Sequence, residues 1–340
     1  MNILKYICLP GLLASGDIQT VSAVESKTDK NPNILVILID DAGYNDFGFM
    51  GSKEMQTPNI DALTSEGVVF TDAHVAATVS SPSRACLITG RYGHRFGYEC
   101  NLSDRTNGLP LEEETIAEVF KTNGYRTAAI GKWHLGSRDE QHPNNRGFDL
   151  FYGMKAGGRD YFYNEKKSDR PGDERNLLLN DRQVKFEKYL TDAFSEKAVE
   201  FINESSQPFM MYLAYNAVHT PMQATDEDMA KFEGHPRQKL AAMTYALDRG
   251  VGTVIRGLKD SGKFDNTLIF FLSDNGGATT NQSSNYPLKG FKGNKFEGGH
   301  RVPYFVVWKN GIPAGKPYDG LVSSLDIFAT AIDAEIGRAH

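Results

Sequence analysis

An unbroken apolar run near the start of the chain limits the possible folds more than any other feature. Residues Asn33–Ile39 read Asn-Ile-Leu-Val-Ile-Leu-Ile. A run of apolar, largely β-branched residues predicts a strand that is buried on both faces. Comparable runs occur at Phe209–Ala214 and Thr267–Ser273. Because helices cover both faces of a sheet made of such strands, the sequence predicts the α/β class.

Segments that resemble helices lie between these strands. Thr57 and Pro58 predict the start of a helix that ends at Gly67, and Thr191 is expected to cap a helix over Asp192–Ile202. Further helices are expected over residues 113–121, 240–258 and, amphipathic, 322–334; further strands over 68–70, 126–130 and 304–308. The predicted fold is therefore a large, mostly parallel central sheet flanked by helices.

Charge and cysteine content exclude several classes of protein. The 340 residues include 37 Lys and Arg against 43 Asp and Glu, a net charge of −6. This balance argues against a general nucleic-acid binder, which needs a basic face. The sequence also lacks the long apolar run of a stable membrane span. Cys8, Cys86 and Cys100 are too few for a disulfide scaffold and lack the spacing of a zinc site, while a Cys86–Cys100 pair stays open.

Both ends of the chain have unusual composition. Residues 1–23 resemble a secretory signal peptide: Lys5 precedes an apolar stretch at residues 6–14, and Val21-Ser22-Ala23 could be its cleavage site. This predicts an exported protein, with a plain N-terminal extension as the alternative. Residues 336–340 read Ile-Gly-Arg-Ala-His. We interpret them as a translated sequencing artefact, the alternative being a genuine short C-terminus.

Polar residues follow the predicted strands at the point where each strand ends. Asp40 and Asp41 follow the first buried strand, and Asp274 and Asn275 follow the last one. Lys132 and His134 follow the strand predicted over residues 126–130, and His219 follows the one at Phe209–Ala214. Carboxyl ends of parallel strands share one edge of a sheet, where ligands bind. One Asp-Asp pair alone is more often a turn or cap, but two oxygen-bearing pairs at one edge favour Ca²⁺ or Mg²⁺.

The segment Ser80–Gly90 is rich in hydroxyl groups and reads Ser-Ser-Pro-Ser-Arg-Ala-Cys-Leu-Ile-Thr-Gly. Its hydroxyls precede an expected helix start, where backbone N–H groups favour an anion, and Arg84 adds a fixed cation. An ordinary serine-rich helix cap is the alternative.

This segment resembles the signature of the formylglycine-dependent sulfatases, in which Cys or Ser is followed by x-Pro-Ser-Arg and later Thr-Gly. The resemblance includes stretches similar to those of arylsulfatases and N-acetylgalactosamine-6-sulfatase, within the alkaline-phosphatase-like superfamily. Matching stretches occur in family order at residues 33–41, 57–61, 124–127, 131–136, 146–149, 219–221, 273–276 and 297–303. The resemblance implies a sulfatase catalytic domain over residues 24–335, with the family's C-terminal subdomain missing from this sequence.

The resemblance implies a mechanism and the residues that perform it. Ser80 would be oxidised to formylglycine by a serine-type maturase typical of bacteria. One hydroxyl of its hydrate would attack sulfur, and the second would then expel sulfate. The ligands of one Ca²⁺ would be Asp40, Asp41, Asp274, Asn275 and the modified Ser80. Arg84 would hold the nucleophile, Lys132 and Lys292 would bind sulfate oxygens, His134 would orient or deprotonate the nucleophile, and His219 would contact sulfate or protonate the leaving alcohol. Taken singly, each of these lysines and histidines is more often structural.

The substrate is less constrained by the sequence. The resemblance implies a sulfated glycan, such as an algal galactan or a host glycosaminoglycan, hydrolysed in the periplasm or outside the cell. His94, Arg95, Arg159 and Asp160 could contact it, with structural hydrogen bonding as the equal alternative. The competing functions are a phosphodiesterase or phosphonate hydrolase of the same superfamily, a glycan-binding protein with a dead site, and a sulfatase fold that is inactive in this length.

Overall fold

A computed structural model describes residues 31–101 and 108–336 of the chain. The predicted signal peptide, residues 1–23, lies outside the described residues. So do residues 337–340 of the predicted artefact, whereas Ile336 is the last residue of a helix.

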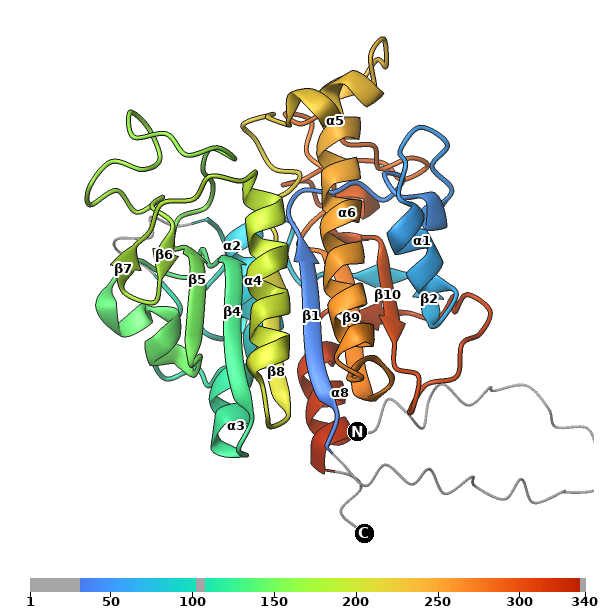
Figure 1. Ribbon diagram of the computed structural model, residues 1–340. Helices are drawn as coiled ribbons and strands as arrows, with labels where there is room; N and C mark the ends of the chain where they lie inside the picture. Colours follow the sequence, from blue (N-terminus) through green and yellow to red (C-terminus); the bar gives the residue numbers. More distant parts are fainter. Residues whose placement is uncertain (1–30, 102–107, 337–340) are drawn as a thin grey trace, which may run out of the picture.

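A nine-stranded sheet forms the centre of the molecule, as Figure 1 shows. Five adjacent strands, β9, β1, β8, β4 and β5, run parallel, which confirms the predicted mostly parallel sheet. Antiparallel strands extend it at both edges. In sheet order the strands are β2 (Val68–Phe70), β10 (Tyr304–Val307), β9 (Thr267–Ser273), β1 (Asn33–Ile39), β8 (Phe209–Ala214), β4 (Arg126–Lys132), β5 (Leu150–Met154), β6 (Leu178–Leu179) and β7 (Arg182–Gln183).

Helices cover both faces of the sheet and form two apolar cores. The first core lies under α1 (Pro58–Thr64), α4 (Leu190–Glu204) and α6 (Gln238–Asp260), with α5 (Asp226–Lys231) beside α6. The second lies under α2 (Ser80–Thr89), α3 (Ile116–Thr122) and α8 (Asp326–Ile336). Strand β1 is completely buried because its alternate side chains enter the two cores: Leu35 and Ile37 the first, Ile34 and Val36 the second.

Short elements connect these layers. They are the two-stranded sheet of β3 (Ala73–His74) and β11 (Val322–Ser323), the helix α7 (Glu297–His300), and 3₁₀ turns at Gly48–Met50, Gly93–Arg95, Asp139–Gln141, Pro143–Arg146 and Phe264–Asn266.

Several sequence-based boundaries are wrong. Helix α1 ends at Thr64 and not at Gly67, and strand β4 continues past residue 130 to Lys132. Helix α4 begins at Leu190, so Thr191 lies inside it and does not cap it. Helix α3 begins at Ile116 because Thr115 and Glu118 form a capping box that fixes its first turn. Residues 322–323 form a strand rather than the start of the last helix, because they pair with β3.

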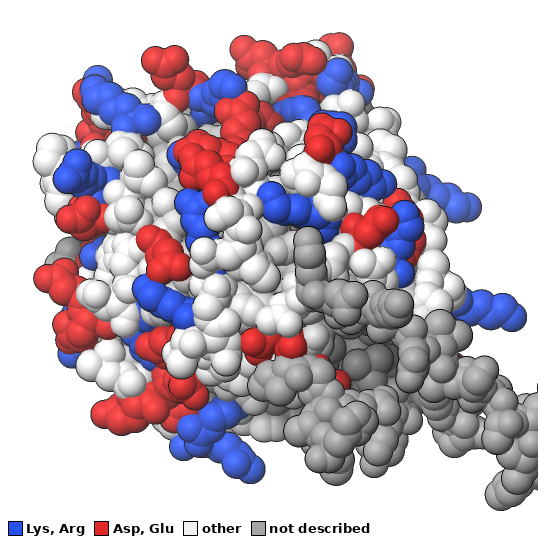
Figure 2. Space-filling view, turned by 60° about the horizontal axis from the view of Figure 1, so that its bottom comes forward, with Lys and Arg blue, Asp and Glu red and all other residues white. Residues whose placement is uncertain are grey.

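The face drawn in Figure 2 has mixed charge, and the two described cysteines are free thiols. Positive and negative side chains alternate on the face drawn in Figure 2. Cys86 is a buried free thiol and Cys100 an exposed one. Among the described residues, no helix is both long and apolar enough to cross a bilayer.

Candidate active site

Carboxylates meet where β1 and β9 end. The two strands pair in register up to Ile39 and Ser273, so the residues that follow leave the sheet side by side. The Asp41 N–H donates to Asp274 Oδ1 over 3.2 Å, and the Asn275 amide donates to Asp41 Oδ1 over 2.9 Å. Asp40, Asp41, Asp274 and Asn275 are all at most 2% exposed. The sheet therefore brings together the two oxygen-bearing pairs, as the sequence predicted.

Ser80 is the first residue of α2, and its hydroxyl points into this cluster. Its Oγ lies 3.2 Å from Asp40 Oδ1 and 3.2 Å from Asn275 Oδ1. Lys292 Nζ lies 3.4 Å away on another side. A hydroxyl has only one hydrogen to donate, so it serves one of the two oxygens at a time. The nucleophile predicted from the sequence therefore lies among acceptor oxygens and one cation.

Arg84 lies one helical turn after Ser80 in α2 and holds the Asp274 carboxylate in place. Its guanidinium is completely buried and donates to Asp274 Oδ2 through Nε at 3.1 Å and Nη2 at 2.8 Å. The same group donates to the Lys132 carbonyl and the Tyr212 hydroxyl. Burial alone would lower its pKa, but Tyr212 and Asp274 outweigh burial and raise it. Arg84 is therefore a permanent charge within the site.

Two lysines pair with Asp40 and Asp41, the two aspartates that directly follow β1. Lys132 Nζ lies 2.7 Å from Asp40 Oδ2, and Lys292 Nζ lies 2.6 Å from Asp41 Oδ1. Burial lowers the pKa of Lys132, although Asp40 opposes it. Burial also acts to lower the pKa of Lys292, but Asp41 and Asp40 outweigh it and raise that pKa. The two lysines thus reach the carboxylate cluster from different segments of the chain, and Lys292 also reaches the Ser80 hydroxyl.

The two predicted histidines stand at the margin of this cluster. His219 Nδ1 lies 2.6 Å from the Thr220 carbonyl, and its Nε2 lies 3.7 Å from Asp41 Oδ2. Because a carbonyl only accepts, Nδ1 carries a hydrogen and Nε2 is the nitrogen that faces the site. Burial, reinforced by Lys132, holds the pKa of His134 well below its usual value. His134 is thus neutral near pH 7.

The donors of this cluster suit a hard divalent cation. Single ligand atoms of Asp40, Asp41 and His219 lie within 4.8 Å of one another. Carboxylate oxygens from β1 and β9 and the Asn275 amide oxygen add the hard ligands that Ca²⁺ prefers. Arg84, Lys132 and Lys292 balance the charge of the three aspartates. The residues present therefore fit Ca²⁺.

The four predicted sugar contacts are less clearly placed. Arg159 is buried, and its Nη2 pairs with Asp169 Oδ1 at 2.7 Å. Asp160 accepts from Ser168 at 2.7 Å and from Gln223 at 2.9 Å. These contacts are of the structural kind that the sequence left as the alternative.

His94 and Arg95 lie in the exposed 3₁₀ turn that follows α2. This turn is attached to α2 at Cys86, whose sulfur accepts from the Gly93 N–H. A role in binding substrate stays a prediction for both residues.

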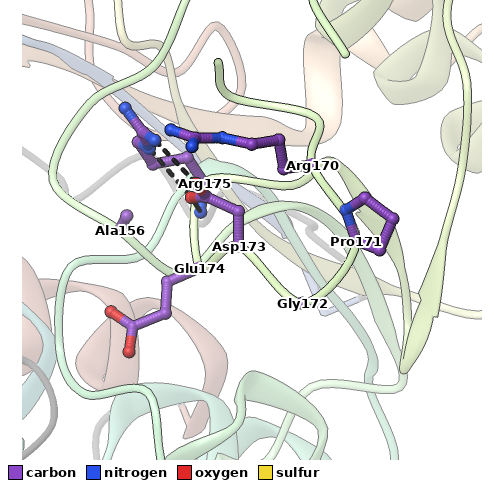
Figure 3. Close-up of a pocket in the computed structure, with 7 residues that line it drawn as sticks. All are labelled: Ala156, Arg170, Pro171, Gly172, Asp173, Glu174 and Arg175. Atoms are coloured by element: carbon purple, nitrogen blue, oxygen red, sulfur yellow. Dashed lines mark hydrogen bonds and ion pairs between the residues drawn. The ribbon is translucent and has the colours of Figure 1, made fainter. Parts of the chain in front are cut away.

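A cavity of about 570 Å³ lies beside the segment that supports the histidines. Ala156 and residues 170–175 line it, and the guanidinium groups of Arg170 and Arg175 lie close together in Figure 3, both donating to the Lys167 carbonyl. Arg175 is paired with Asp173 at 2.6 Å. Ala156, which lines the cavity, directly precedes Gly157 and Gly158, and these two glycines pack against His134 and His219.

Several residues that shape the site were not found from the sequence. Tyr212 reaches Arg84 from within the apolar strand β8, and Asn281 and Ser283 bind the Asp41 carbonyl. No local signal marks these residues. Gly157 and Gly158 leave room for the rings of His134 and His219, and a glycine pair inside a polar loop was the available signal.

The comparison with protein families agrees with this geometry. The model of the sulfatase family matches residues 32–335. The chain belongs to the sulfatase family. Its resemblance to this family and its alkaline-phosphatase-like fold are thereby confirmed.

Named relatives and a solved structure support this membership. The sulfatase chain is 36% identical over 348 residues to mouse arylsulfatase G, covering 88% of this chain and 64% of that protein. It is 33% identical over 324 residues to dog N-acetylgalactosamine-6-sulfatase, covering 88% and 62%. It also resembles Ps i-CgsB, solved in complex with k-i-k-neocarrahexaose, with 43% identity, a TM-score of 0.85 and coverage of 92% of this chain and 73% of that one. The chain thus spans somewhat less than two-thirds of the length of these curated relatives.

Proposed function

We propose that the protein is a sulfuric ester hydrolase that removes sulfate from a sulfated carbohydrate, with a formylglycine made from Ser80 and one bound Ca²⁺. The observation that carries this proposal is the position of the Ser80 hydroxyl. Its oxygen lies within 3.2 Å of side-chain oxygens of Asp40 and Asn275 and 3.4 Å from the ammonium group of Lys292. A nucleophile placed among metal-type ligands and cations suits attack on an anionic ester.

Five residues would hold the metal: Asp40, Asp41, Asp274, Asn275 and the modified Ser80. When bound, Ca²⁺ would neutralise sulfate oxygens and lower the pKa of the nucleophile. Arg84 already fixes Asp274 through two hydrogen bonds, so this carboxylate is oriented before any ligand arrives. Such preorganisation avoids a reorganisation cost during the reaction.

Formylglycine would supply a hydrated aldehyde whose two hydroxyls serve attack and release. Arg84 and His134 would hold this group at the start of α2. Lys132 and Lys292 would bind sulfate oxygens, since their ammonium groups pair with Asp40 and Asp41 beside the nucleophile position. The Nε2 of His219 faces the site and, when the ring carries a proton on both nitrogens, would give the Nε2 proton to the leaving alcohol.

The substrate proposal rests on the similarity to Ps i-CgsB, which was solved with k-i-k-neocarrahexaose. This similarity favours a carrageenan-type galactan over a host glycosaminoglycan. We place further sugar contacts in the cavity that Arg170 and Arg175 line (Figure 3), because its lining residue Ala156 directly precedes the two glycines that pack against the histidines. His94 and Arg95 stay candidates, whereas the contacts of Arg159 and Asp160 favour a structural role.

Export and maturation complete the proposal. The predicted signal peptide would direct the protein to the periplasm or the outside of the cell, where sulfated polysaccharides occur as substrates. A serine at the nucleophile position requires a serine-type maturase as a partner.

The alternative is a phosphodiesterase or phosphonate hydrolase of the same superfamily. Such enzymes generally use two zinc ions and more histidine ligands, whereas the cluster at β1 and β9 has His219 alone beside its aspartates within the described residues. The oxygen-rich ligand set therefore favours the sulfatase.

The test uses protein co-expressed with a serine-type maturase, together with the Ser80→Ala variant. Neocarra-oligosaccharides and 4-nitrophenyl sulfate are compared with 4-nitrophenyl phosphate and a phenylphosphonate ester. We expect sulfate release that Ser80→Ala abolishes. Faster hydrolysis of the phosphorus esters would instead support the alternative.

A further inference from the structure

A second group of metal-ligating side chains lies outside the catalytic cluster. His74 is the last residue of β3, and Glu297 and His300 begin and end the short helix α7. We propose that these three residues bind a divalent transition metal ion of borderline softness, with Zn²⁺ as the best match. None of them has a role in the proposed hydrolysis.

The ligand atoms are close enough to share one ion. One atom from each residue lies within 4.8 Å of the other two. His74 Nε2 lies 3.2 Å from Glu297 Oε2 and 3.4 Å from Oε1. Adjacent ligands of a tetrahedral zinc ion are separated by roughly 3.4 Å, given bonds of about 2.1 Å. The His74–Glu297 pair therefore already has the spacing of two zinc ligands.

The third ligand needs only a small side-chain movement. The rings of His74 and His300 have their centroids 5.1 Å apart, with planes inclined by 37°. Glu297 and His300 are three residues apart, so a helical turn puts both side chains on one side. Rotation about the His300 side chain would complete the set without any change of the backbone.

The backbone around the three residues is firmly held. The Val75 N–H donates to the His300 carbonyl over 2.8 Å, and the Val302 N–H donates to the Ala73 carbonyl over 2.9 Å. The Ser324 N–H donates to the His74 carbonyl over 2.9 Å. Two ligand-bearing segments that are far apart in sequence are thus fixed against each other before an ion binds, which lowers the ordering cost of binding.

The chemistry of this donor set differs from that of the catalytic cluster. Two imidazoles and one carboxylate suit Zn²⁺ and its neighbours in the first transition row. The oxygens of Asp40, Asp41 and Asp274 suit Ca²⁺ instead. The side chains of His74 and Glu297 are 18% and 47% exposed, so an ion can reach them from solvent. The chain therefore offers two cation sites of different selectivity.

An ion-pair network is the competing explanation of the cluster. Arg301 Nη1 lies 3.3 Å from Glu297 Oε2 and 3.4 Å from Asp72 Oδ1. However, Arg301 also donates to the Thr71 carbonyl through Nε at 2.9 Å, which anchors it independently of Glu297. Asp72 Oδ1 lies 3.9 Å from His74 Nδ1, on the side of the ring where metal-bound histidines have a carboxylate partner. The surroundings are thus compatible with an ion between His74 and Glu297.

The test first strips the protein of metal ions, then saturates it with Ca²⁺ to fill the oxygen site, and finally titrates it with Zn²⁺ as the only transition metal. Calorimetry measures the stoichiometry and affinity. We expect one Zn²⁺ per chain. The affinity for Zn²⁺ should fall by about 10- to 100-fold in His74→Gln and in His300→Gln. His94→Gln, at an exposed histidine elsewhere, should bind Zn²⁺ as the unsubstituted protein does.

Two results would overturn the proposal. One is the absence of Zn²⁺ binding; the other is binding that survives both substitutions but is lost in His219→Gln, which would place the ion at the catalytic cluster. X-ray absorption of the Zn²⁺-loaded unsubstituted protein removes the dependence on whether a variant folds. It should show two imidazoles and one carboxylate, and a shell of oxygens only would contradict the proposal.

Discussion

Lys132 Nζ lies 2.7 Å from Asp40 Oδ2, and neither side chain is exposed to solvent. Asp40 follows β1 and Lys132 ends β4, two strands that β8 separates in the sheet, so their pairing joins the site to the core. A buried charge without its partner is costly. The pair is therefore a point at which the catalytic site and the stability of the fold can be tested together.

Lys132→Met is expected to lower stability by about 3 to 5 kcal/mol when Ca²⁺ is absent, because Asp40 loses its nearest cation. Added Ca²⁺ should recover part of this loss, since the ion would replace the missing charge. Thermal unfolding with and without Ca²⁺ measures both effects. Lys316→Met, at an exposed lysine, should change stability by less than about 0.5 kcal/mol. Equal losses in the two variants would contradict the pairing.

Gly157→Ala is expected to reduce kcat/KM by about 100-fold although it removes no catalytic group. A Cβ at this position would lie 2.7 Å from His134 Nε2, so the ring has to move. Gly158→Ala is the matched control, since its Cβ would lie 3.3 Å from the nearest atoms of the His219 ring. Steady-state kinetics should show a much smaller loss for this variant. Two equally active variants would mean that the position of His134 is not critical.

Removal of Ca²⁺ with a chelator should lower the melting temperature of the protein. Ligand at 100 times its Kd stabilises the folded state by about 2.7 kcal/mol. Asp41→Asn should remove most of this response, because Asp41 contributes a buried carboxylate to the cluster. Glu165→Gln, at an exposed glutamate, should retain the full response. A Ca²⁺ response that Asp41→Asn leaves intact would locate the ion elsewhere.

His134 should make stability depend on pH below about 6.5. Burial, with Lys132 next in importance, holds its pKa in the folded protein well below the value of the unfolded chain. Between these two pKa values the unfolded chain binds a proton that the folded protein does not. Stability therefore falls as the pH falls through this interval, and this contribution is constant above it.

His134→Asn removes the titrating ring and should flatten the pH dependence. Asparagine is the suitable replacement because the backbone here has a φ of 58°, which asparagine tolerates. Melting temperatures of both proteins at pH 7.5 and 5.5 give the comparison. If the variant loses as much stability on acidification as the unsubstituted protein, the pH dependence comes from other groups.

The sequence predicted the central strands well because their signal is physical and local. Strands β1, β8 and β9 have the predicted bounds, since a run buried on both faces has no polar residue until it ends. The same reasoning placed Asp40 and Asp274 at one edge. In contrast, Thr191 lies within α4, because the helix begins one residue before it.

Contacts between residues far apart in the chain could not be predicted from the sequence. Tyr212 lies in an apolar strand, and only the packing of α2 over β8 brings its hydroxyl to Arg84. The pairing of Lys132 with Asp40 and of Lys292 with Asp41 likewise depends on the fold and not on spacing. Residues 322–323 form a strand because β3 lies next to them.

The most direct test of the proposed chemistry is the mass of the tryptic peptide that ends at Arg84 and contains Ser80, Ser81 and Ser83. The protein should come from co-expression with a serine-type maturase. Conversion of Ser80 to formylglycine predicts a loss of about 2 Da, assigned to Ser80 by fragmentation. An unchanged peptide mass in the presence of an active maturase would contradict the formylglycine mechanism.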